Sequence, residues 1–79
     1  MARPKNQTAR RSEIVAAAQR AVAKHGPDGA RLNRVAEEAG LTSGAVLYYY
    51  PNVDDLMLEA NREAMERFYE QRVQMLASL

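Results

Sequence analysis

Apolar residues recur every three or four positions along most of the chain, the spacing that places them on one face of an α-helix. The first such segment is predicted as a helix over about residues 12–25. Ser12 is a good N-cap, and Glu13 complements the partial positive charge of a helix N-terminus. Gly26 and Pro27 then end the run. Its apolar positions are Ile14, Ala18, Ala21 and Val22.

Two shorter helices are predicted next, over about residues 32–39 and 43–50, with a turn between them. Gly40 ends the first of them, and Thr42 or Ser43 can cap the second. Their apolar positions, with one in the turn, are Leu32, Val35, Ala36, Ala39, Leu41, Val46 and Tyr50. An eight-residue helix, a Gly-Leu-Thr turn and a second short helix have the spacing of a helix-turn-helix. An ordinary helical hairpin inside a bundle gives a similar pattern, so spacing alone leaves both open.

A long fourth helix is predicted to follow Pro51 and to run nearly to the C-terminus. Asn52 can cap it, and Asp54 and Asp55 lie in its positive first turn. Its apolar positions are Leu56, Met57, Ala60, Ala64, Phe68, Val73 and Leu76. Since no segment alternates as a strand does, the predicted fold is all-α, a three-helix bundle containing the helix-turn-helix, followed by the long fourth helix. The far half of that helix has more apolar surface than the bundle can cover.

Three adjacent tyrosines end the third helix, and they cannot share one face because neighbouring helical residues point about 100° apart. If Val46 faces the core, Tyr50 joins it, Tyr48 points outward and Tyr49 lies on a flank. Gly44 and Ala45 keep the outer side slim. A slim helix flanked by hydroxyls suits the DNA major groove. In the alternative interpretation, the tyrosines cover an adjoining helix or another domain.

Composition excludes several functions. The chain of 79 residues allows one domain, and with no cysteine it has neither a disulfide nor a catalytic thiol. No nucleophile, base and orienting group can be assembled, so we predict no enzyme activity, no cofactor and no metal site. No apolar run is long enough for a signal peptide or a membrane span, which predicts a cytoplasmic protein.

The net charge of +1 hides an asymmetry. Residues 1–49 carry a net charge of +4, and residues 50–79 carry −3. A basic half is typical of a phosphate-facing surface and equally of a solvated face. Residues 1–11 are predicted to be a flexible basic arm because Pro4 and polar residues discourage a helix. Arg10 and Arg11 are its candidates for phosphate contact, and a disordered soluble tail is the alternative.

The segment GARLNRVAEEAGLTSGAVLYYYPNVDDLMLEA, residues 29–60, resembles the DNA-binding module of the tetracycline-repressor (TetR) family of bacterial transcription regulators. The resemblance covers the chain from about Ser12 into the fourth helix. It implies a DNA-binding domain over residues 12–60 whose third helix enters the major groove of double-stranded DNA, and it favours a repressor. It also implies a homodimer on a palindromic operator, formed through a second domain to which residues 61–79 connect. The rival function is a helical module that docks a protein through the fourth helix.

The resemblance also assigns DNA-binding residues. The positions that match the family's groove-facing or phosphate-facing residues are Asn33, Thr42, Ser43, Gly44, Ala45, Tyr48 and Tyr49. The sequence departs from the family where Leu47 replaces a phosphate-binding tyrosine and Val53 replaces a lysine. We expect Arg31, with Arg10 and Arg11, to compensate for these two lost anchors.

Overall fold

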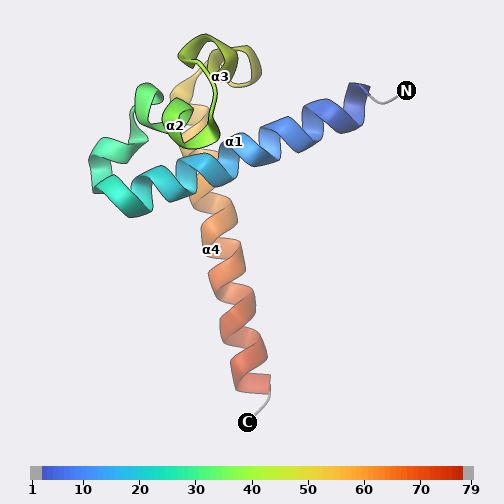
Figure 1. The fold of residues 1–79 in the computed structure, drawn as a ribbon. Coiled ribbons are helices and arrows are strands. Elements are labelled where there is room, and N and C mark those ends of the chain that lie inside the picture. Colours follow the sequence, from blue (N-terminus) through green and yellow to red (C-terminus); the bar gives the residue numbers. More distant parts are fainter. Residues whose placement is uncertain (1–2, 78–79) are drawn as a thin grey trace.

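The computed structural model describes residues 3–77, which are almost entirely helical (Figure 1). The α-helices are α1 (Arg3–His25), α2 (Leu32–Ala39), α3 (Ser43–Tyr49) and α4 (Val53–Ala77), and a short 3₁₀ helix, η1 (Gly26–Ala30), joins α1 to α2. No strand occurs within this part of the chain, so the predicted all-α class is confirmed.

The core lies where α1, α2, α3 and the first turns of α4 meet. Its buried residues are Ile14, Val15, Ala17, Ala18, Ala21, Val35, Ala36, Val46, Tyr50, Leu56 and Ala60. Val22 was predicted to face this core, but its side chain is 38% exposed. Together with Met57 and Ala60 of α4 it lines a hollow of about 330 Å³ between α1 and α4, and this space leaves the side chain partly exposed. The rest of α4 projects away from the bundle, and residues 61–77 are exposed.

The N-terminal segment differs from the prediction, because α1 begins at Arg3 and no helix boundary falls at Ser12. Pro4 is the second residue of the helix, where its missing N–H would have had no helical partner. Arg10 Nη1 also forms an ion pair with Glu13 Oε2 at 3.0 Å, one turn apart on α1. The expected irregular arm is therefore a helical extension as far as the structure describes it, and Met1 and Ala2 lie outside the described residues.

The connection from α1 to α2 depends on two glycines. Gly26 adopts φ +63°, the left-handed conformation predicted for it after a helix. The Pro-Asp-Gly reversal forms η1, and it brings Gly29 against the backbone of α1. A Cβ atom at Gly29 would collide with the carbonyl group of Ala21, so only glycine fits there. This close approach seats α2 against α1.

Polar contacts fix α1 to its two neighbours. Glu38 on α2 accepts from Lys24 Nζ at 2.8 Å and from Arg20 Nε at 3.3 Å, both on α1. The Lys24 ammonium group is the main cause of a lowered pKa for the Glu38 carboxyl group. Gln19 Nε2 donates to the carbonyl oxygen of Ala60 on α4 at 3.0 Å. These contacts hold α1, α2 and α4 as the support on which α3 lies.

Candidate nucleic-acid interface

The turn between α2 and α3 has the geometry that the sequence predicted. Gly40 takes φ +69°, and the Leu41 N–H donates to the carbonyl oxygen of Ala36 at 2.9 Å. Thr42 caps α3, because its Oγ1 accepts from the Ala45 N–H at 3.1 Å. Since Ala36 is only 4% exposed beneath the crossing, the small side chain lets α2 and α3 approach closely.

The tyrosine triplet separates into the roles predicted from the helical rotation. Val46 and Tyr50 face the core and are at most 3% exposed, whereas Tyr48 is 71% exposed. Tyr49 is half-buried, and its ring stands edge-on to that of Tyr48 with centroids 5.0 Å apart. The interpretation that Tyr48 covers a neighbouring helix is therefore wrong for the described part of the chain.

The outer side of α3 is slim as well as exposed. Gly44 is exposed, and a Cβ atom added there would meet nothing nearer than Thr42 Oγ1 at 4.0 Å. Thr42 is also exposed, while Ser43 and Ala45 are half-buried at the first turn. In Figure 1, α3 lies at one end of the molecule and the C-terminal end of α4 at the other. Tyr48, Gly44 and Thr42 are thus exposed together on this side of α3.

Arg11 of α1 lies beside the three tyrosines. Together with Gln7, Tyr48 and Tyr49, it lines a shallow depression of about 300 Å³. Its guanidinium carbon lies 4.7 Å from the centroid of the Tyr50 ring, a cation–π distance. The phosphate candidate Arg11 thus contacts the protein's own aromatic residue, which the sequence did not indicate.

Tyr50 has a further partner that sequence reasoning missed. Its hydroxyl group donates to Glu59 Oε2 on α4 at 2.8 Å. Burial is the main cause of a raised pKa for this hydroxyl group, so it remains a donor at neutral pH. The one sequence signal for Glu59 was its place three residues after Leu56, at the edge of the core-facing side of α4.

The other predicted cations also have partners within the protein. Arg31 is exposed, and its Nε atom lies 2.9 Å from Asp28 Oδ1. Arg34 Nε shares the same carboxylate at 3.3 Å. Arg10 pairs with Glu13 along α1. Such exposed ion pairs contribute little stability, so these side chains can exchange a carboxylate for a phosphate at small cost. Asn33 is exposed on the first turn of α2.

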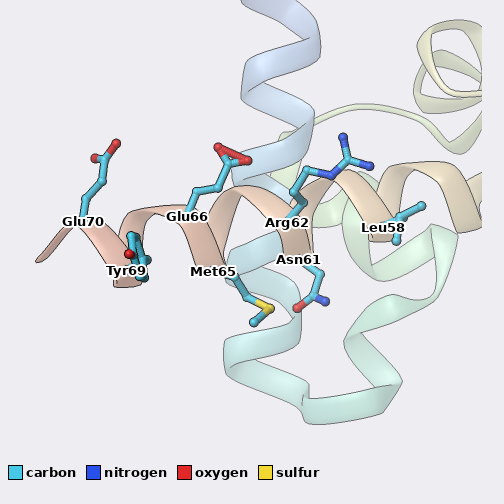
Figure 2. A pocket seen from close by; sticks show the side chains of 7 residues that line it. All are labelled: Leu58, Asn61, Arg62, Met65, Glu66, Tyr69 and Glu70. Carbon is cyan, nitrogen blue, oxygen red and sulfur yellow. The ribbon is translucent and has the colours of Figure 1, made fainter. Parts of the chain in front are cut away.

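The long helix α4 presents a different kind of surface. A hollow of about 490 Å³ is an open face along α4 (Figure 2). Its lining residues are Leu58, Asn61, Arg62, Met65, Glu66, Tyr69 and Glu70. Over the described residues, no group of His, Asp or Glu side chains could hold a metal ion. Nor is any helix in that part of the chain long and apolar enough to cross a membrane.

Comparison with known proteins agrees with this geometry. The family description "Bacterial regulatory proteins, tetR family" matches residues 14–60. The HTH-type transcriptional repressor AcnR of Corynebacterium jeikeium is 38% identical over 61 residues, which are 77% of this chain and 32% of that protein. The HTH-type transcriptional regulator PksA of Bacillus subtilis is 34% identical over 58 residues, 73% of this chain and 28% of that protein. No solved structure matches significantly. The chain spans about a third of the length of these relatives.

Proposed function

We propose that this chain reads a specific DNA sequence with α3 in the major groove. It belongs to the tetR family of bacterial regulatory proteins, since the match to that family spans residues 14–60, more than half of the chain. One observation carries the proposal. Val46 and Tyr50 anchor α3 in the core, while the opposite side is slim and presents Tyr48 to solvent. A helix of that form can enter a groove about 12 Å wide.

The residues on and around α3 have different roles in contacting bases and phosphates. Gly44 and Ala45 let the backbone of α3 approach base edges, and the hydroxyl groups of Tyr48 and Tyr49 reach bases or phosphates. Thr42 and Ser43 place a hydroxyl group and backbone N–H groups at the start of the helix, toward a phosphate.

Cations around α3 add sequence-independent affinity. Arg31 with Asn33 would approach the DNA from the start of α2, and Arg10 with Arg11 from α1. Arg31 replaces part of the phosphate binding that Leu47 and Val53 do not provide. These four side chains are exposed, and the ion pairs of Arg10 and Arg31 contribute little stability, which supports their availability to DNA.

The whole protein, in this proposal, is a repressor that binds a palindromic operator as a homodimer through a domain beyond the segment shared with its relatives. Relatives about three times as long support such a domain. The 79-residue chain alone contacts one half-site, so we expect weak binding that falls steeply with salt. Protein docking through the far half of α4 is not favoured as the function, because the family description and the names of the relatives give regulators of the HTH type. The relatives are named as transcriptional regulators and not as enzymes, and we propose that this chain likewise has no enzyme activity.

Selection from a random duplex library tests the proposal. Several rounds with the 79-residue chain should enrich one half-site sequence. NMR titration with the enriched duplex should then shift the amide signals of residues 42–49 more than a shuffled duplex of the same composition does. Failure to enrich any sequence, or shifts confined to residues 65–77, would refute it.

The salt dependence of binding tests Arg31. Arg31→Ala should lower the slope of log affinity against log salt by about 0.9, the value for one phosphate contact. Arg72→Ala on the far half of α4 removes the same charge and serves as the matched control. Equal slopes for the two variants would show that Arg31 does not contact phosphate.

A further inference from the structure

We propose that the Tyr50 hydroxyl group, Glu59 and Arg11 form a positioning cluster that fixes the direction of α3 and thereby sets how well it discriminates between DNA sequences. The second half of this statement rests on the proposed function. The cluster binds no DNA base itself. Tyr50 and Glu59 act through α3, whose exposed side meets the bases, and Arg11 restrains Tyr50 in addition to the phosphate contact proposed for it above.

The geometry connects three helices at one side chain. Tyr50 is the C-cap residue directly after α3, and it is 3% exposed. Its hydroxyl group reaches α4 through the hydrogen bond to Glu59, and its ring face meets Arg11 of α1. A single side chain at the end of α3 is therefore held by two separate elements, and both contacts depend on direction.

Helix α3 needs such a device because it is short. It has seven residues, and Val46 is its fully buried anchor. Apolar contact around Val46 is not directional, so it limits the distance of α3 from the core better than it limits the tilt. A hydrogen bond at the end of the helix adds the missing restraint.

A small tilt at Tyr50 would move the N-terminal end of α3 far enough to change its contacts with DNA. Gly44 lies six residues before Tyr50, which is about 9 Å along a helix axis. A tilt of roughly 10° about Tyr50 would thus displace the leading end of α3 by roughly 1.5 Å. That displacement is enough to break a hydrogen bond between a side chain and a base edge. Phosphate contacts made by long, flexible cations tolerate it better, so sequence discrimination should suffer more than overall affinity.

Tyr50→Phe is the central test, because it removes the hydroxyl group and keeps the ring and the charge. Residual dipolar couplings measured without DNA should show α3 reoriented relative to α1 and α4. The ratio of affinities for the enriched and shuffled duplexes should fall about three- to tenfold, which lies within the net contribution of one typical hydrogen bond. The salt slope should not change.

Three further variants separate positioning from simple stabilisation. Tyr69→Phe, at an exposed tyrosine of α4, is the matched control and should change neither measurement. Glu59→Ala should reproduce the effect of Tyr50→Phe. Glu59→Gln keeps a carbonyl oxygen that can accept from Tyr50, so it should retain discrimination within about twofold of the wild type.

The outcomes are distinguishable. Unchanged dipolar couplings in Tyr50→Phe, or a lower melting temperature with an unchanged affinity ratio, would overturn the proposal. If the wild-type chain enriches no DNA sequence, the proposed function fails, and the dipolar couplings alone decide whether the cluster orients α3.

Discussion

Substitutions at Gly44 should separate the stability of the domain from its affinity for DNA. The residue is the second of α3, and an added Cβ atom would meet nothing nearer than 4.0 Å. Gly44→Ala should therefore fit without strain and restrict the unfolded chain, stabilising the domain by about 0.4–1 kcal/mol. For a domain of this size, that corresponds to a rise in melting temperature of about 2–8 °C. Thermal and urea denaturation followed by circular dichroism measure both quantities.

A larger side chain at the same position should damage binding without damaging the fold. Gly44→Leu keeps a good helix former and the same charge, but it fills the slim side of α3. We expect affinity for the enriched duplex to fall about tenfold or more, 1.4 kcal/mol, because the backbone can no longer approach the base edges. Gln71→Leu adds the same side chain to an exposed position on α4 and is the matched control.

Two results would refute this reasoning. If Gly44→Ala destabilises the domain, the space around Gly44 is not open as the structure shows it. If Gly44→Leu binds the enriched duplex as tightly as Gln71→Leu does, that side of α3 does not enter the groove, whatever part of the chain binds DNA.

Three further predictions concern the support of α3. Gly29→Ala should destabilise the domain by about 3 kcal/mol in urea denaturation, because its Cβ atom would press on the backbone at Ala21; a stability equal to the wild type would contradict this close approach. Thr42→Ala should cost about 1 kcal/mol in the same measurement through loss of the α3 cap, and Thr42→Ser should restore it. Glu38, whose pKa is lowered chiefly by Lys24, contributes stability that is present above its ordinary pKa of 4.5 and is lost as pH falls through the lowered value. The stability difference between the wild type and Glu38→Gln should thus be constant near neutral pH and shrink below pH 4.5, and a difference independent of pH would exclude this ion pair as its source.

Much of the fold could be predicted from the sequence because local rules decide it. Helical spacing of apolar residues, a left-handed glycine at Gly40 and a cap at Thr42 are set by the chain itself. The same rotation of 100° per residue assigned Tyr48 to solvent and Tyr50 to the core. Where a side chain's surroundings follow from its own helix, the prediction was sound.

The start of α1 differs from the prediction for a local reason, because Pro4 lies in the first turn of the helix, where its missing N–H costs no hydrogen bond. Two other features depend on contacts between elements. The exposure of Val22 depends on how closely α1 and α4 pack beside it. The tight seat of Gly29 depends on how closely η1 approaches that helix. The local pattern of apolar residues does not predict how closely separate helices pack.

The cluster around Tyr50 shows a difference between two kinds of residue. Residues that face DNA can be identified from the sequence, whereas residues that orient α3 can be identified only from the folded structure. Tyr48 and Gly44 could be assigned from helical rotation and from a family resemblance, because an exposed side needs only the right residue types at the right spacing. Glu59 and Arg11 lie nine and thirty-nine residues from Tyr50 in the chain, and they meet it only after α1 and α4 have packed. A substitution at either position leaves the exposed side of α3 chemically intact. If the direction of α3 matters for discrimination, two chains with the same outward residues can therefore differ in DNA specificity.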